Sequence, residues 1–404
     1  MIHPLKALLT AGVACCVLAA CSSSYPRFTE DEFRDRTIRF ELDLAESYAD
    51  IRETTIEVAA QKLRRFAADP STGRPTLDIL ILSSGGADGA FGAGFLQGWG
   101  EVTEPGYERP TFDRVTGSST GALMSPYALV GTDETYQRLV DLYANPGSDW
   151  IKEQVLSGVL FGKQALVNND GLKRLVRREI TPEFLEQIGE RVDDESLLLA
   201  GAVNLDLGRF QIFDLTQIAA EGDEEAFEDV ILASSAIPGF FPPVDIDGWT
   251  YADGATVANL FLGVDRDLIW REDAGPWWDP AKNAPKLLIR HWVIVNGTIS
   301  LEDEEVKRTW SGVGTRALSQ LILSTNVRAL QQLELMKIIG RRRPDVEFEV
   351  RWVAVPKDAD LPESDDMFDE TYMRALIELG RAMGRDPASW REESPLLELV
   401  REGS

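Results

Sequence analysis

The chain has 404 residues, of which 44% are hydrophobic, so it is long enough to bury a large core in one big domain or two ordinary ones. Its 67 acidic residues outnumber its 41 basic residues, which gives a formal net charge of −26. Because nucleic-acid binding needs a basic surface that neutralises phosphates, this balance argues against a nucleic acid as partner.

The first 20 residues have the features of a bacterial export signal. Lys6 supplies the positive charge, and the apolar segment after it is too short to span a membrane. Small residues precede Cys21 and three serines follow it, which resembles a lipoprotein signal, whose cysteine becomes acylated. No cysteine follows Cys21, so we expect no internal disulfide. We expect a lipid-anchored protein of the bacterial cell envelope, on the periplasmic or outer membrane face; an ordinary signal peptide is the alternative.

Residues 21–75 are predicted to form a polar tether and an N-terminal helical arm, which ends where Pro70 to Pro75 break the helical pattern. From residue 76 onward, short apolar segments alternate with helical patterns. This alternation predicts an α/β fold with a mainly parallel central sheet flanked by helices, and with helical additions at both ends. We place a catalytic domain at 76–300 and, packed on it at 301–404, a C-terminal helical region with one late strand.

The individual elements follow from the same patterns. Strands are expected at 76–84, 112–117, 196–208, 209–215, 248–255, 287–297 and 346–355. Helices are expected at 120–130, 133–144, from 223 to the residue before Pro238, at 302–339, and twice near the C-terminus.

A glycine-rich segment, SSGGADGAFGAG at 83–94, follows the first strand. It lacks the Gly-Lys-Ser/Thr of a phosphate-binding Walker loop, and Gln97 stands where a dinucleotide-binding motif needs Gly or Ala. Gly85 and Gly86 can turn their backbone N–H groups outward, since no Cβ blocks the approach. Such groups beside a helix N-terminus suit an oxyanion; close packing of helix on strand is the alternative.

The segment Gly117-x-Ser119-x-Gly121 lies between a predicted strand and a predicted helix, as in a nucleophile elbow. A flexible loop is the alternative. A nucleophilic serine needs a base, and His291 is the one imidazole outside the export signal. Its position within a predicted strand favours a core histidine. If His291 is not the base, an aspartate must be; a Ser–Asp–His triad of the α/β-hydrolase type remains the alternative.

Three blocks in this order resemble the patatin-like phospholipase family over about residues 76–300. They are LSSGGADGAFGAGFL at 82–96, GSSTGAL at 117–123, and ASSAIPGFFPPV at 233–244 followed by YADGA at 251–255. They are similar to the family's glycine-rich oxyanion segment, its serine elbow and its Asp-Gly-Gly/Ala block.

The resemblance implies a Ser–Asp dyad, with Ser119 as nucleophile and Asp253 as base. It also implies an oxyanion hole formed by the amides of Gly85, Gly86 and Ala87. The expected activity is hydrolysis of lipid acyl esters, as by a phospholipase A or lysophospholipase, with no cofactor and no metal. The expected partners are an acyl-ester lipid and the membrane that holds Cys21. A catalytically inactive envelope lipoprotein that acts as a scaffold is the alternative from another class.

Two further features bear on the substrate. Many family members carry Arg or Lys where this chain has Asp88, which disfavours anionic headgroups if Asp88 lies at the mouth of the site. Trp277 and Trp278 lie in a proline-flanked loop that could form a lid, since tryptophan favours membrane interfaces; aromatic packing within the loop is the alternative.

Overall fold

The structure is a computed structural model that describes residues 27–146, 170–192, 194, 196–263, 285–300, 305–363 and 368–393. The predicted export signal, Cys21, Trp277 and Trp278 lie outside these residues. Within the described ranges, no helix combines the length and the apolar character that a membrane-spanning helix needs.

The described residues contain one sheet of eight strands, in the order β5-β6-β3-β2-β1-β7-β8, with β4 paired to β3. Five neighbouring strands run parallel to one another: β3, β2, β1, β7 and β8. The strands β4, β5 and β6 are antiparallel to their neighbours. The strands are β1 (Thr76–Leu82), β2 (Arg114–Ser118), β3 (Leu197–Asn204), β4 (Arg209–Asp214), β5 (Val244–Ile246), β6 (Trp249–Asp253), β7 (Leu287–Val295) and β8 (Val346–Ala354). The predicted α/β fold with a mainly parallel sheet is confirmed.

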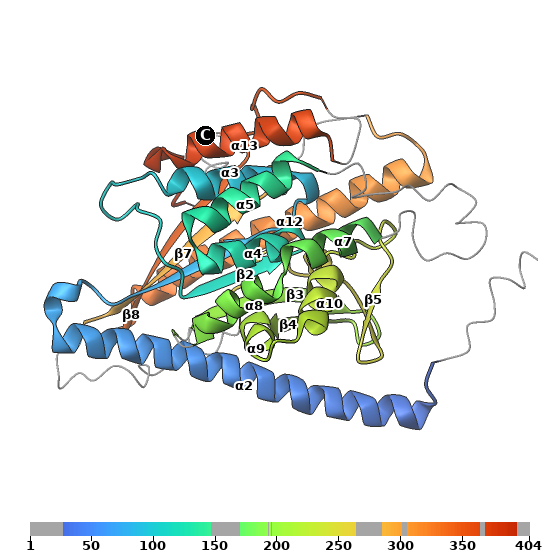
Figure 1. Cartoon of the computed structure of the whole chain (residues 1–404), viewed down its shortest axis with the longest axis horizontal. Coiled ribbons are helices and arrows are strands. Elements are labelled where there is room, and N and C mark those ends of the chain that lie inside the picture. The colour runs from blue at the N-terminus through green and yellow to red at the C-terminus, as the bar shows by residue number, and fades with distance from the viewer. Residues whose placement is uncertain are drawn as a thin grey trace, which may run out of the picture.

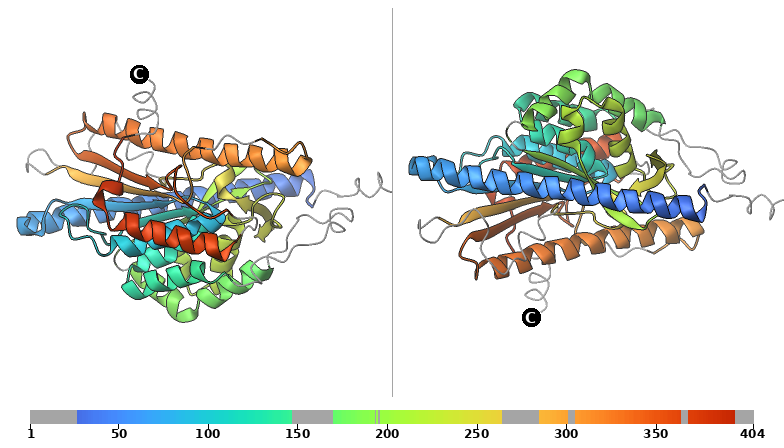
Figure 2. Two further views of the ribbon diagram at one scale, coloured as in Figure 1. Left: turned by 90° about the horizontal axis from the view of Figure 1, so that it is seen from above. Right: turned by 90° about the horizontal axis from the view of Figure 1, so that it is seen from below.

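Helices cover both faces of this sheet and make a three-layer molecule (Figures 1 and 2). One face is covered by α3 (Gly89–Trp99), α4 (Thr120–Val130), α5 (Asp133–Ala144), α7 (Asp170–Glu179), α8 (Pro182–Gly189), α9 (Leu215–Ala220), α10 (Glu224–Ser234) and α13 (Glu370–Gly384). The other is covered by α2 (Glu30–Ala68) and α12 (Trp310–Gly340). Side chains alternate along a strand, so Leu80 and Leu82 face the first group while Ile79 and Ile81 face the second.

The helices predicted at 120–130 and 133–144 are confirmed as α4 and α5. The helix expected to reach Pro238 ends earlier, at Ser234. The chain leaves the helix there because the carbonyl of Ala236 accepts the amide of Asp253 (2.9 Å), and because the residue before a proline disfavours helical backbone angles. Of the two helices expected near the C-terminus, α13 is one; after it, the described residues form a single 3-10 turn at Pro387–Ser389.

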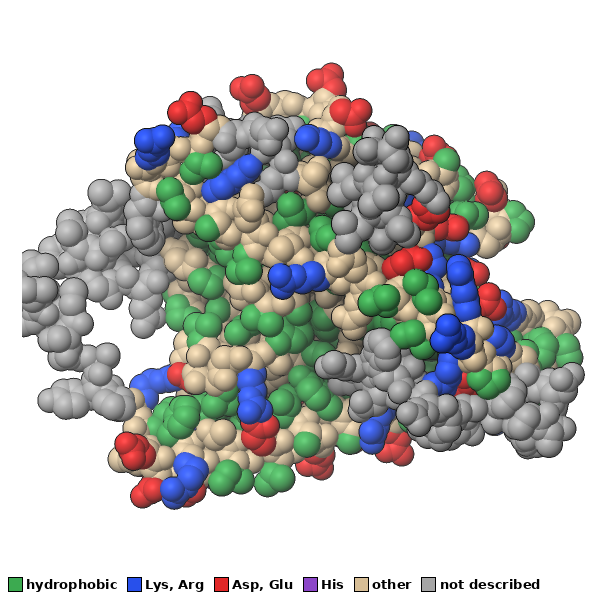
Figure 3. All heavy atoms as spheres, turned by 180° about the vertical axis from the view of Figure 1, so that it is seen from behind, with side chains coloured by type: hydrophobic (Ala, Val, Ile, Leu, Met, Phe, Trp, Pro, Cys, Tyr) green, Lys and Arg blue, Asp and Glu red, His purple; other side chains and the backbone are tan. Residues whose placement is uncertain are grey.

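Two short 3-10 turns lie at the carboxyl end of the parallel strands. The turn η2 (Gly86–Asp88) connects β1 to α3, and η4 (Gly254–Thr256) follows β6. Because α12 leads back to the start of β8, its N-terminal half also lies toward this end of the sheet. On the side opposite to that of Figure 1, acidic and basic side chains are interspersed, with uncharged side chains between them (Figure 3).

Candidate active site

Strand β3 brings the predicted serine and aspartate together. Ser118, the last residue of β2, pairs with Gly201 on one side of β3, and Asp253, the last residue of β6, pairs with Ala202 on the other. Ser119 and Asp253 therefore leave their strands at the same level. The Ser119 side chain lies close enough to the Asp253 carboxylate to lower its pKa.

Ser119 occupies a backbone conformation that residues with a Cβ rarely adopt. Its φ is 54° and its ψ is −122°, directly before the first residue of α4. Its amide donates to Ser234 Oγ (2.9 Å), which donates in turn to the carbonyl of Gly201 (2.7 Å). The turn thus carries strain of the kind found at functional sites, and this polar chain holds it in place.

The two glycines of the elbow are needed because backbone approaches backbone. A Cβ on Gly117 would lie 2.3 Å from the carbonyl carbon of Gly121, and a Cβ on Gly121 would lie 2.4 Å from the carbonyl oxygen of Leu82. No side chain fits at either position. The Gly-x-Ser-x-Gly spacing is therefore a consequence of packing the start of α4 against the ends of β1 and β2.

Asp253 is a buried carboxylate whose hydrogen-bond partners are uncharged. It is 2% exposed, and its carboxylate accepts the amide of Ala255 (2.8 Å). Burial raises the pKa of Asp253 to about 7, and the Ala255 amide and the Ser119 side chain offset only part of this effect. No Lys or Arg of the described chain forms an ion pair with it. The group can therefore gain and lose a proton near neutral pH.

The loop after β1 lies beside this pair. The hydroxyl of Thr120, the residue after Ser119, donates to the carbonyl of Gly86 (3.1 Å), which connects the loop to the elbow. Gly86 has a φ of 57°, which favours glycine, and a Cβ there would meet open space. Within the described residues, no backbone partner accepts the amides of Gly85, Gly86 or Ala87.

Two buried asparagines that the sequence analysis did not assign to the site hold the start of this loop. The side-chain oxygen of Asn259 accepts the amide of Ser84 (2.6 Å). Asn296 donates its side-chain amide to the carbonyl of Ser83 and its backbone amide to Ser83 Oγ, both at 2.8 Å. A signal was present for Asn296, since a polar residue directly after a buried strand lies at the carboxyl edge of a parallel sheet.

His291 is not brought to this site. It is fully buried within β7, where it pairs with Ile79 of β1, and Ile79 pairs with Arg114 of β2. That level is five residues before Ser119, which corresponds to roughly 16 Å along the strands. The prediction of a core histidine is confirmed by its burial. The described residues also contain no cluster of three His, Cys, Asp or Glu that could hold a metal ion.

Comparisons with known proteins found a matching family model, a relative and a similar solved structure. A family model described as patatin-like phospholipase matches residues 80–264, which include the loop after β1, Ser119 and Asp253. The chain is 29% identical over 195 residues to a protein of Pseudomonas aeruginosa (strain BWHPSA011 / Pa011) named cGAMP-activated phospholipase. That match covers 46% of this chain and 55% of the relative, so it spans about half of the relative's length. The crystal structure of VipD from Legionella pneumophila is similar at a TM-score of 0.33 and 12% identity, over 76% of this chain and 67% of that chain.

Proposed function

We propose that this protein hydrolyses the carboxylic ester bonds of phospholipids or lysophospholipids, since residues 80–264 match the patatin-like phospholipase family model. In this proposal Ser119 is the nucleophile, Asp253 is the general base, and the amides of Gly85, Gly86 and Ala87 form the oxyanion hole. One observation carries the proposal: a strained serine lies beside a buried carboxylate that no cation of the described residues neutralises.

The first half of the reaction transfers the acyl group to the enzyme. Ser119 Oγ attacks the acyl carbonyl carbon while the Asp253 carboxylate accepts its proton. The carbonyl oxygen becomes an oxyanion that accepts the loop amides, each worth roughly 3 kcal/mol in comparable sites. When the ester C–O bond breaks, the proton on Asp253 passes to the leaving alcohol, and the acyl group stays on Ser119.

The second half releases the fatty acid. A water attacks the acyl carbon, and Asp253 accepts one of its protons. The bond between the carbon and Ser119 Oγ breaks, the proton returns to Oγ, and the free enzyme is restored. Since burial raises the pKa of Asp253 to about 7, the carboxylate can act as base and its protonated form as acid near neutral pH.

The position of His291 favours this dyad over the triad alternative. The histidine is buried at the level of Arg114, five residues away from Ser119 along the strand direction. An imidazole roughly 16 Å from the serine cannot take its proton directly.

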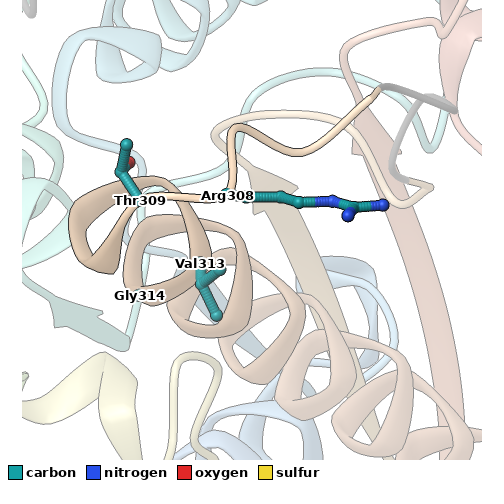
Figure 4. Close-up of a pocket in the computed structure, with 4 residues that line it drawn as sticks. All are labelled: Arg308, Thr309, Val313 and Gly314. Carbon is teal, nitrogen blue, oxygen red and sulfur yellow. The ribbon is translucent and has the colours of Figure 1, made fainter.

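Exposed apolar side chains at the carboxyl end of the sheet support a lipid as substrate. Val257, four residues after Asp253, is 51% exposed, and Val313 and Leu321 in the N-terminal half of α12 are 55% and 45% exposed. A hollow of about 440 Å³ lies at the start of α12, lined by Arg308, Thr309, Val313 and Gly314 (Figure 4). An apolar rim of this kind suits contact with acyl chains.

We also propose that a lipid on Cys21 anchors the protein to a membrane of the bacterial cell envelope. The support is the sequence around Cys21 together with a lipid substrate, which a membrane-bound enzyme would meet where it resides. Wild type should sediment with membranes and incorporate labelled palmitate, and Cys21→Ser should do neither. Equal labelling of both proteins would rule out this anchor.

Fatty-acid release from phospholipids, lysophospholipids and simple esters tests the proposed hydrolysis. Ser119→Ala and Asp253→Asn should each lower kcat by about 1,000-fold or more, because both remove a group that takes part in every turnover. Ser118→Ala is the matched control, since that neighbouring hydroxyl bonds to the carbonyl of Ala258, and it should stay within about fivefold of wild type.

A fluorophosphonate probe distinguishes the enzyme from the scaffold alternative. The probe should label wild type and Ser118→Ala but not Ser119→Ala. Folded wild type that neither takes up the probe nor releases fatty acid would reject the proposed function in favour of a scaffold.

A further inference from the structure

Helix α13 lies outside the matched range 80–264, yet it packs against α3, the helix that follows the oxyanion loop. Figure 1 shows the two helices together on one face of the sheet, and they are also adjacent when the molecule is seen from above (Figure 2). This region contains none of the residues on which the proposed mechanism rests.

The contact between the two helices is made through backbone. A Cβ on Gly94 of α3 would lie 2.1 Å from the carbonyl oxygen of Ile377, and a Cβ on Gly380 of α13 would lie 2.1 Å from that of Phe91. The contact repeats one turn further on, at Gly98. Helices that touch in this way cannot slide past each other without a clash, so α13 has a fixed position relative to α3.

The N-terminal end of α13 carries a side chain that reaches the oxyanion loop. The Tyr372 hydroxyl donates to Asp88 Oδ1 (2.9 Å). Asp88 is the last residue of η2 and precedes the first residue of α3. Its own amide donates to the carbonyl of Gly85 (3.0 Å). A chain of two hydrogen bonds thus joins Tyr372 to the first glycine of the loop.

The hydrogen bond from Tyr372 affects the charge state of the Asp88 carboxylate. Burial raises the pKa of Asp88 to about 6, and the hydrogen bond from Tyr372 is what opposes this rise. The Tyr372 hydroxyl therefore stabilises the charged carboxylate. Asp88 is partly exposed, and one of its carboxylate oxygens accepts the Tyr372 hydroxyl.

We propose that Tyr372 is a positioning residue for the acyl-transfer reaction, which holds Asp88 and so fixes the amides of Gly85, Gly86 and Ala87 at the place where the oxyanion forms. This inference rests on the proposed function. It makes α13 part of the active site although the helix lies beyond the matched family range. Tyr372 does not touch the reacting atoms, and its effect passes through Asp88.

The test is steady-state kinetics of the full chain with Tyr372→Phe, which keeps the ring and removes the hydroxyl. Misplaced oxyanion donors stabilise the transition state less but leave substrate binding intact, so kcat should fall about 10-fold to 100-fold while KM stays within about twofold. The melting temperature should change little. Tyr107→Phe is the matched control: its hydroxyl also reaches a carboxylate of the C-terminal segment, Glu392 (3.4 Å), but away from the loop, and its kcat should not change.

A double-mutant cycle makes the assignment specific. Asp88→Asn can still accept the tyrosine hydroxyl, so it should keep more activity than Asp88→Ala. In the Asp88→Ala background, Tyr372→Phe should cause no further loss, because the hydrogen bond is already gone.

The results separate the two proposals. An active wild type with unchanged kcat in Tyr372→Phe overturns the positioning role alone, as does a loss that adds fully to that of Asp88→Ala. A folded wild type that releases no fatty acid and takes up no probe overturns the proposed function and this inference together.

Discussion

The two ends of the parallel strands bury carboxylates in opposite ways. At the amino ends, Asp78 accepts Arg290 Nε (2.7 Å), and the neighbouring Asp113 forms an ion pair with Lys62 (2.7 Å). At the carboxyl ends, Asp253 accepts the amide of Ala255 and lies beside the Ser119 side chain, with no ion pair among the described residues. Burial raises the pKa of Asp113 too, but the charge of Lys62 opposes this rise, whereas no cation of the described residues opposes it at Asp253. The comparison separates a structural carboxylate from one suited to general-base chemistry.

The difference also has a cost in stability. A folded-state pKa of about 7, against about 4 in the unfolded chain, corresponds to an upper limit of about 4 kcal/mol lost above pH 7. At the amino ends, the charge of Lys62 offsets part of the same burial effect on Asp113. Substitutions at the two ends should therefore change stability in opposite directions.

The largest effect is expected at the amino ends, for Asp78→Asn. The carboxylate accepts two nitrogens of Arg290 and Nε1 of Trp292 (2.9 Å), so its replacement leaves a largely buried guanidinium without its counter-charge. Breaking a buried pair in this way costs about 3–5 kcal/mol. Urea unfolding should show a loss in this range, and kcat per folded molecule should stay near that of wild type.

An exposed pair at the same end of the sheet is the control for this loss. Arg74 precedes β1 and pairs with Glu347 of β8, with side chains 41% and 50% exposed. Glu347→Gln should cost less than about 1 kcal/mol. Equal losses in Asp78→Asn and Glu347→Gln would contradict the view that buried pairing sets the stability of this end.

The next effect has the opposite sign and depends on pH. Between the unfolded pKa near 4 and the folded pKa of about 7, folded wild type binds more protons at Asp253 than the unfolded chain, so its stability falls as pH rises through this window. Asp253→Asn does not titrate. The free energy of unfolding of the variant, relative to that of wild type, should therefore rise by about 2 kcal/mol between pH 5 and pH 8 in urea unfolding. The variant should also be inactive.

The wild-type rate provides an independent check of the same pKa. If the carboxylate is the base, kcat/KM should rise about tenfold per pH unit below pH 7 and level off above it. A rate that is flat from pH 5 to pH 8, together with a constant stability difference between wild type and Asp253→Asn, would show that Asp253 does not titrate in this window.

Local patterns were sufficient to predict much of the fold and to nominate the site. Alternating apolar segments indicated the strands. The elbow glycines were recognisable because a Cβ on Gly117 would clash with Gly121, and a Cβ on Gly121 would clash with Leu82. Such constraints act within a few residues. The roles of Ser119 and Asp253 remain predictions, although the structure places the two side chains next to each other.

What the sequence did not indicate depends on contacts between distant segments. The glycines of α3 and α13 contribute no apolar side chain, so no periodic pattern marks the surface on which Gly94 and Gly380 meet. The early end of α10 depends on a hydrogen bond from Asp253 to Ala236. Tyr372 could not be assigned to Asp88 for the same reason, because neither residue carries a signal for the other.

The smallest effect tests the strain at the carboxyl end directly. Ser119 has a φ of 54°, a conformation that costs a residue with a Cβ about 1–3 kcal/mol and costs glycine little. Ser119→Gly and Ser119→Ala both remove the hydroxyl, so both should be inactive. Their difference isolates the backbone: Ser119→Gly should be more stable than Ser119→Ala by about 1 kcal/mol, since part of the relief is cancelled by the greater freedom of glycine in the unfolded chain. If urea unfolding finds the alanine variant to be the more stable, the turn is not strained, and the contrast between a relaxed amino end and a strained carboxyl end would then rest on Asp253 alone.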